Sequence, residues 1–426
     1  MQTIAVKQRM GRQQRLIKKE KNAYENKVMK KWNWSILTFG VLCWLWVFCS
    51  SDTIFAKTPD TQFQNDVMNA YADAMLEGEM RGFESLMSET SENELFFKYL
   101  QWRYAAMEIL EDGYDAYSYE ITDVTNVSDT EIKIEFNEYF HYANIDFQGF
   151  SMGLVLDIKV DEGCIQSISV QNDDCFDAFM NNLSFKGRSA GIEKEEDQID
   201  LQMLIEDIRI LKSEMDSVCS SQTARLEQDE TENWARATAY SYSASRGAEY
   251  AKKYAKDANS SFYAASADCT NFVSQCIWAA YGGWNSSMST TKMTSNISNK
   301  VRMVSGSWYA GSGGGSSNWE SVNNLWSYAT SNSGNGPKAK GYNNGGKYTG
   351  IQPIDISVGD VLQVSGNGKS YTHSVYVIGT PGGSNPSYGE IVVAQHSSNK
   401  TRTLSNLLLS YNYMRQMRFQ SGKFAS

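Results

Sequence analysis

Cys269 is the residue of this chain whose position best suits nucleophilic chemistry. Asp268, which precedes it, is a residue type favoured at the N-cap of a helix. A helix that begins there directs unpaired backbone N–H groups and the positive end of its dipole at the Cys269 sulfur, and both stabilise a thiolate over a thiol. The residues at the helical period after Cys269 are apolar, which predicts that the helix packs on a sheet. From this segment alone, a buried structural cysteine is an equally good interpretation.

Two histidines in the strands that follow supply the partners such a thiol needs. Short β-branched runs separated by turn-rich segments predict an antiparallel meander with strands at residues 360–364, 373–378 and 391–396. Symmetric pairing of the last two strands sets Ile378 opposite Ile391, and therefore His373 opposite His396. Directly opposed residues share a face, with Cβ atoms about 5 Å apart. The three residues then correspond to a cysteine nucleophile, its base and the group that orients the base.

The order of these segments resembles a known group of enzymes. DCTNFVSQ at 268–275, a tryptophan-containing middle, GD at 359–360 and HSVYV at 373–377 resemble papain-like cell-wall hydrolases of the NlpC and CHAP type. They are more closely similar to the putative amidase domain of Gram-positive bacteria. The resemblance is confined to the C-terminal half, and its matching pieces are residues 246–255, 267–276, 319–325, 359–362 and 373–375.

This resemblance implies roles for individual residues. It implies Cys269 as the nucleophile and His373 as the base, and it suggests His396 as the third member of a triad. The last polar residue varies in this class among His, Asn, Gln and Glu, so Asn399 is an alternative third member. No metal or organic cofactor is implied.

The sequence supports a zinc site or a disulfide at these cysteines less well than it supports a nucleophile. Cys269 and Cys276 are seven residues apart, which is about 10.5 Å along a helix. That separation is too large for a shared zinc ion or for a disulfide, so Cys276 is interpreted as a core residue. His141 lies among aromatic strand residues without a constellation of acids or cysteines that would indicate a site, and is interpreted as structural.

The N-terminus predicts export. Residues 1–31 carry ten Lys or Arg against two acidic residues, and residues 32–51 carry no charge. We expect residues 1–56 to be a signal peptide or membrane anchor, with the chain beyond them extracellular or on the surface of a Gram-positive type of cell. Residues 1–56 contribute +7 to the net charge of −10, which leaves −17 for residues 57–426 and argues against a nucleic-acid partner. The membrane is a partner only through the N-terminal segment.

Three further segments follow this N-terminus. Residues 57–185 read as two helices and then four strands, near 117–127, 131–142, 151–160 and 164–171, an α+β accessory domain that resembles NTF2-like or cystatin-like folds. Residues 186–232 read as a helical linker, and residues 233–426 as a papain-like α+β amidase domain. Aromatic residues within the Gly- and Ser-rich stretch 305–350 suit either a cleft wall or a small core.

The sequence therefore predicts an exported cysteine amidase or peptidase that hydrolyses amide bonds, with peptidoglycan or a peptide as its substrate. Two alternatives are a non-catalytic surface-binding protein and an acyltransferase of the same clan. The sequence does not indicate which amide bond is cleaved or what the oligomeric state is.

Overall fold

The computed structural model describes residues 61–189, 201–223 and 239–424. The signal peptide or anchor expected within residues 1–56 lies outside these ranges. Among the helices that are described, none combines the length and the apolar character needed to cross a bilayer.

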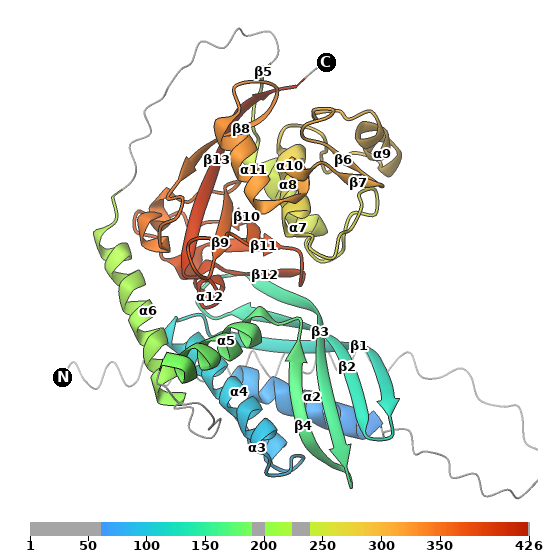
Figure 1. Ribbon diagram of the computed structural model, residues 1–426, viewed down its shortest axis with the longest axis vertical. Coiled ribbons are helices and arrows are strands. Elements are labelled where there is room, and N and C mark those ends of the chain that lie inside the picture. Colours follow the sequence, from blue (N-terminus) through green and yellow to red (C-terminus); the bar gives the residue numbers. More distant parts are fainter. Residues whose placement is uncertain (1–60, 190–200, 224–238, 425–426) are drawn as a thin grey trace, which may run out of the picture. The chain divides into compact units, whose positions relative to one another are not determined.

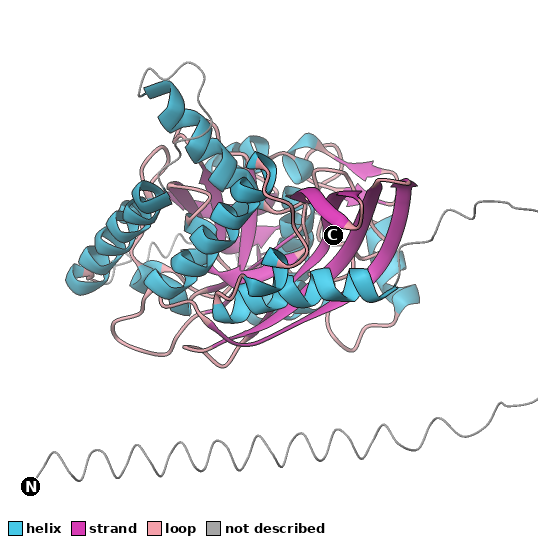
Figure 2. Ribbon diagram, turned by 90° about the horizontal axis from the view of Figure 1, so that it is seen from below, coloured by secondary structure: helices cyan, strands magenta, loops and turns pink. Residues whose placement is uncertain are grey.

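The N-terminal half is an α+β arrangement in which helices precede and follow four antiparallel strands (Figure 1). Its elements are α2 (Thr61–Glu77), α3 (Arg81–Glu84), α4 (Ser91–Ile109), β1 (Tyr114–Ser128), β2 (Glu131–Tyr142), β3 (Gln148–Asp161), β4 (Cys164–Gln171), α5 (Asp174–Ser189) and α6 (Leu201–Ser221). The four expected strands are confirmed, and the bounds of β2 and β4 are those predicted. Figure 2 shows the helices of this half against one face of its curved sheet.

Alternation along β2 explains which face of that sheet is covered. Ile132, Ile134 and Phe136 are all buried, and they pack in one cluster with apolar residues of α2 and α4. The start of α4 is fixed by Thr90, whose side chain accepts a hydrogen bond from the Asn93 backbone N–H, as an N-cap residue does. The apolar stripe expected in the linker region forms part of α6, and its buried members Leu204, Ile208 and Met215 join the same cluster.

The C-terminal half begins with helices and ends in strands. Its elements are β5 (Ala239–Tyr240), α7 (Ala244–Tyr254), α8 (Cys269–Ala280), α9 (Thr290–Ser298), β6 (Ala310–Gly311), β7 (Gly314–Gly315), α10 (Ser317–Glu320), α11 (Val322–Ser331), β8 (Gly336–Tyr342), η2 (Tyr348–Gly350), η3 (Pro353–Asp355), β9 (Val361–Ser365), β10 (His373–Gly379), η4 (Tyr388–Glu390), β11 (Val392–Gln395), β12 (Lys400–Thr403), α12 (Leu404–Leu408) and β13 (Tyr413–Lys423). The expected meander corresponds to β9, β10 and β11, which pair in antiparallel fashion.

One sheet runs through both halves of the chain. Its main path is β1-β2-β3-β12-β11-β10-β9-β13-β5, with β4 paired to β3 and β8 paired to β13. The junction is short: Lys400 and Thr401 of β12 pair with Ser151 and Phe150 of β3. The apolar cluster of α2 and α4 also continues into the C-terminal half, where it includes Val375 of β10. The two halves therefore share a sheet and a core.

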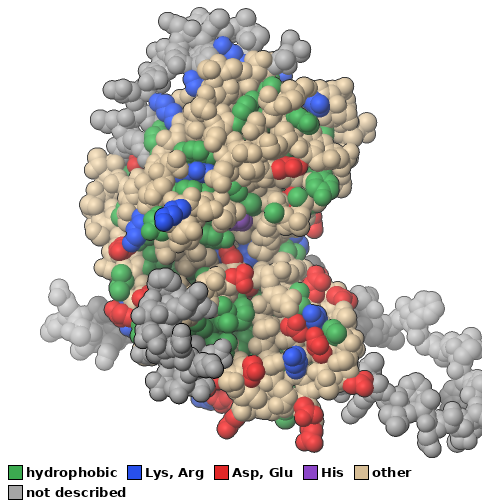
Figure 3. All heavy atoms as spheres, in the orientation of Figure 1, with side chains coloured by type: hydrophobic (Ala, Val, Ile, Leu, Met, Phe, Trp, Pro, Cys, Tyr) green, Lys and Arg blue, Asp and Glu red, His purple; other side chains and the backbone are tan. Residues whose placement is uncertain are grey.

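The surface charge differs between the halves. On the face shown in Figure 3, Asp and Glu side chains are frequent over the N-terminal half and sparse over the C-terminal half. On this face, the acidic side chains thus gather over the N-terminal half.

Candidate active site

Cys269 is the first residue of α8, as the sequence predicts, but Asp268 does not cap the helix with its side chain. Asp268 has φ −95° and ψ −2°, a helical conformation, whereas a capping residue is typically extended. Its Oδ1 instead accepts hydrogen bonds from the Ala265 backbone N–H (3.1 Å) and from Asn271 Nδ2 (2.7 Å). Asp268 therefore occupies the N-cap position, as predicted, without a side-chain capping bond, and its carboxylate holds the loop before α8 against the helix.

Every residue of α8 is buried, which fixes the position of its first turn. Phe272, Val273 and Ile277 are fully buried, and α8 packs most extensively on α7 and then on β10. Cys276 is also fully buried, and burial raises the pKa of its thiol well above the usual range. The interpretation of Cys276 as a core residue is confirmed.

The structure brings Cys269 and His373 together. Cys269 is 6% exposed and His373, the first residue of β10, is 7% exposed. Burial alone would raise the pKa of the Cys269 thiol, but hydrogen bonding to His373 and the histidine's charge, together with the Ser374 backbone and the Thr270 hydroxyl, hold it below its usual range. A thiol that titrates early despite its burial beside an imidazole is the arrangement of an activated nucleophile.

His396 does not lie opposite His373. The structure pairs Tyr376 with Ala394 and Val377 with Val393, one residue away from the expected register. On the loop side Gly379 pairs with Val392, two residues away from the expected register, and a β-bulge at Ile378 reduces this shift to one residue toward His373. Because side chains alternate along a strand, a one-residue slip moves a residue to the opposite face, so the expected facing of the two histidines was wrong.

Both ring nitrogens of His396 are bonded elsewhere. Nδ1 lies 2.6 Å from Asp268 Oδ2, and Nε2 donates to the Tyr254 carbonyl oxygen at 2.7 Å. The ring stacks on Phe272 with centroids 4.0 Å apart. His396 thus anchors Asp268, and with it the start of α8, and does not contact His373 in this structure.

Asn399, the alternative third residue, is also engaged away from His373. Its Nδ2 donates to the Lys256 carbonyl oxygen at 2.9 Å. Neither predicted third member therefore orients the imidazole.

Two residues that the sequence did not single out lie around His373. The Tyr411 ring is parallel to the imidazole, with centroids 5.9 Å apart and planes 9° apart. Gln395 is 1% exposed and lies at the end of β11, where the observed register places it diagonal to His373 on the same face. Nε2 of His373 is buried and has no hydrogen-bond partner in the part of the chain that the structure describes.

Gln395 also links this site to the N-terminal half. Its Oε1 accepts a hydrogen bond from Arg402 Nη2 at 3.0 Å, and Arg402 forms an ion pair with Asp174 at the start of α5. Lys400 Nζ contacts both Asp174 (2.9 Å) and Asp173 (3.2 Å). The Ser410 hydroxyl, next to Tyr411, donates to the Asp174 carbonyl oxygen at 3.1 Å.

The acids of this network do not form an open metal site. Asp173, Asp174 and Cys175 offer ligand atoms within 4.8 Å of one another. The two carboxylates are already bonded to Lys400 and Arg402, and burial raises the pKa of Cys175 to about 12, so its thiol stays protonated at neutral pH. The cluster is therefore an ion-pair network.

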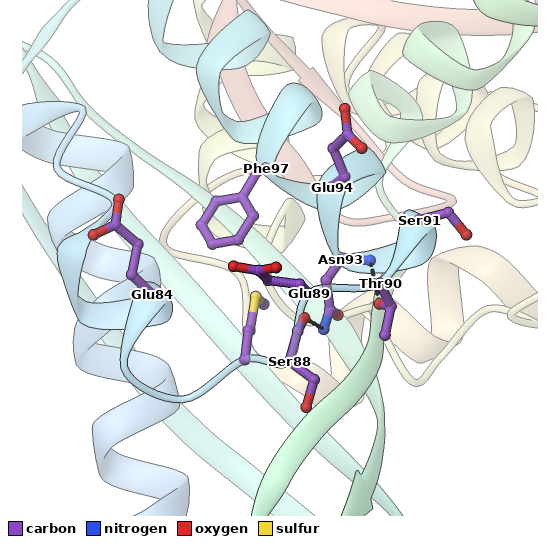
Figure 4. Close-up of a pocket in the computed structure, with 9 residues that line it drawn as sticks. Glu84, Ser88, Glu89, Thr90, Ser91, Asn93, Glu94 and Phe97 are labelled. Carbon is purple, nitrogen blue, oxygen red and sulfur yellow. Dashed lines mark hydrogen bonds between the residues drawn. The ribbon is translucent and has the colours of Figure 1, made fainter. Parts of the chain in front are cut away.

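A pocket of different character opens in the N-terminal half beside the start of α4 (Figure 4). Glu84, Glu89, Glu94 and Phe97 are among the residues that line it, and none of the candidate catalytic residues does. Within 305–350, Trp308 and Trp319 are fully buried core residues, whereas Tyr309, Trp326 and Tyr342 are partly exposed.

Comparison with known proteins agrees with the chemistry of the C-terminal half. Residues 241–420 match the family model described as a putative amidase domain, a range that contains Cys269, His373, Gln395 and His396. A search of curated proteins finds no match, and neither does a search of solved structures. The C-terminal half of this chain therefore carries an amidase-like domain.

Proposed function

We propose that the chain is a cysteine-dependent amidase of papain-like fold that is exported and cleaves amide bonds in peptidoglycan. The observation that carries the proposal is the pairing of Cys269 with His373: a thiol at the start of a buried helix, with its pKa held down, beside a histidine at the start of a neighbouring strand. The amidase-like domain supports amide hydrolysis in general.

The reaction follows from these two side chains. His373 takes the Cys269 proton, and the thiolate attacks the amide carbonyl to form a tetrahedral intermediate. Backbone N–H groups in the first turn of α8, which the Asp268 side chain does not cap, supply hydrogen bonds to the oxyanion. The imidazolium protonates the departing amine, and a water molecule activated by His373 then hydrolyses the thioester. No cofactor takes part in these steps.

We further propose Gln395 as the group that orients His373. A carbonyl oxygen has two lone pairs, so Oε1 of Gln395 can accept from a His373 N–H while it keeps its bond to Arg402. The unpartnered Nε2 of His373 and the shared face of the two residues support this assignment over His396.

The test is mass spectrometry of purified peptidoglycan incubated with the full chain, with Cys269→Ala as the control. New fragments that carry a free carboxyl and a free amine, and that are absent with Cys269→Ala, are the expected products. Fragments joined to an added amine would identify an acyltransferase. Intact peptidoglycan that nevertheless retains the protein would identify a non-catalytic binding protein and contradict the proposal.

A further inference from the structure

Arg415 is a buried cation that no acid neutralises. It lies on β13, is 4% exposed, and donates only to neutral amide oxygens: Nε to Gln363 (2.8 Å), Nη2 to Asn323 (2.9 Å) and Nη1 to Asn344 (3.1 Å). No carboxylate lies within ion-pairing distance of it among the residues described at 61–189, 201–223 and 239–424. Burying a charge without a counter-ion costs free energy, so the burial of the Arg415 guanidinium requires an explanation.

Other buried cations of the chain differ in this respect. Arg103, Lys400 and Arg402 each contact at least one carboxylate. The same fold thus pairs these cations and leaves Arg415 with amides alone.

Two aromatic rings lie against the Arg415 guanidinium. Its Cζ lies 4.4 Å from the centre of the Trp326 ring and 4.1 Å from that of Tyr371, as in cation–π contacts. Burial, opposed by Tyr371, lowers the pKa of Arg415 to about 10, so the group is still charged at neutral pH. Because a guanidinium has five N–H groups in one plane and three are used, two remain for a ligand in that plane.

A line of hydrogen bonds connects this cation to the catalytic helix. The Thr270 hydroxyl, next to Cys269, lies 3.1 Å from the Ser374 hydroxyl, which accepts from Gln363 Nε2 at 3.2 Å. Ser374, Gln363 and Arg415 are direct cross-strand partners on β10, β9 and β13. They therefore share one face of the sheet, and two strand spacings place Arg415 about 10 Å from the strand of His373.

We propose that Arg415, with Asn323 and Asn344, forms a subsite that binds a carboxylate of an acidic peptide substrate, about three residues from the amide that Cys269 attacks. The distance follows from the two strand spacings and from the length of an extended residue. Asn323 and Asn344 are both exposed, so their amides can turn to admit the carboxylate and donate to it. A planar guanidinium recognises a carboxylate with two parallel N–H bonds. This subsite rests on the amidase function proposed above.

The test uses the full chain with Cys269→Ala, so that binding is measured without turnover. The probes are soluble peptidoglycan fragments, either native or with their carboxyl groups converted to amides, and affinity is measured by calorimetry. We expect the native fragments to bind at least about tenfold more tightly than the amidated ones. Adding Arg415→Gln should remove that preference while the affinity for amidated fragments stays unchanged.

Two further variants separate recognition from folding. Arg415→Lys keeps the charge without the planar pair of donors, so it should retain part of the preference. Arg418→Gln, on the same strand, removes a cation that is paired with Asp360, and it should leave the preference intact. Circular dichroism and the melting temperature of each variant report whether it is folded.

Each outcome decides a different point. Equal affinity for both fragment sets, no binding to either, or equal weakening of both by Arg415→Gln overturns the subsite. If the native fragments bind through Arg415 but the active chain does not cleave them, the subsite stands and the amidase proposal fails.

Discussion

Asp174 and Arg402 form an ion pair that joins the two halves of the chain. The same Arg402 guanidinium donates to Gln395, on the strand beside that of His373, and the backbone of Asp174 holds Ser410 next to Tyr411. Asp174 thus bonds to Arg402 and Ser410, which in turn hold or adjoin Gln395 and Tyr411 beside His373. The N-terminal half is therefore part of the frame of the site as well as a neighbouring module.

Cys269 should be the thiol that reacts first at low pH. At about pH 6, where an ordinary thiol is almost fully protonated, its lowered pKa gives it the larger thiolate fraction. We expect iodoacetamide to modify Cys269 faster than the exposed Cys164 at this pH. Near pH 9 the difference in rate should disappear or reverse, because the accessibility of each thiol then determines its rate. Peptide mapping by mass spectrometry gives both rates. His373→Ala should remove the advantage of Cys269, and its persistence in that variant would contradict the role of His373.

Substitution of His396 should mainly lower stability, whereas substitution of Gln395 should mainly lower the catalytic rate. His396→Ala leaves the Asp268 carboxylate and the Tyr254 carbonyl without their partner, so we expect a loss of about 2–4 kcal/mol in the free energy of unfolding. Gln395→Ala should instead lower kcat by about tenfold, because an orienting group assists the base without replacing it. Asn399→Ala serves as the control and should leave kcat nearly unchanged. A larger kcat loss in folded His396→Ala than in Gln395→Ala would restore His396 as the third member.

Asp112 should make the protein less stable as the pH rises from 4 to 7. Burial raises the pKa of this carboxyl to about 7, against the hydrogen bonds from Ser405 and Thr403, which lower it. Since the folded pKa lies above that of the unfolded chain, the contribution of this group is fully present below about pH 4 and is lost as the pH approaches 7. Asp112→Asn should abolish this pH-dependent loss in the free energy of unfolding, which is on the order of 4 kcal/mol. Urea unfolding at pH 4.5 and 7.5 measures the change, and profiles that stay parallel in the two proteins would count against it.

Lys400 should contribute strongly to the stability of the junction between the N-terminal and C-terminal halves. Lys400→Met removes the cation that contacts both Asp173 and Asp174, and breaking a buried pair from one side costs about 3–5 kcal/mol. The control is Lys98→Met, which removes an i,i+4 pair with the exposed Glu94 and should cost less than about 1 kcal/mol. Denaturant unfolding followed by tryptophan fluorescence compares the two. Similar losses in both variants would mean that the network adds little.

The local sequence pattern predicted those structural features that depend on residues close together in the chain. Alternation of apolar residues located β2 and β4 to the residue, and the spacing after Asp268 located α8, because burial of one face leaves a periodic signature. The register of β10 and β11 was missed because it depends on how the connection between the strands closes and on a bulge at Ile378, and no local pattern marks either. Tyr411 reaches His373 only through the tertiary fold. Gln395 offered a weak signal, since it directly precedes the histidine that was chosen and belongs to the residue types that this class uses.

The pairing of β12 with β3 has a consequence for the order in which the chain is made. The ribosome completes β3 at Asp161 nearly 240 residues before it reaches Lys400, the first residue of β12. Until then, the edge of β3 at Phe150 and Ser151 that faces β12 has no partner, and the Asp174 carboxylate lacks Lys400 and Arg402, the cations that neutralise it. Open strand edges of this kind invite pairing with other chains. A truncated product that ends before residue 400 should therefore aggregate more readily than the full chain, and the burden on chaperones should be greatest late in synthesis.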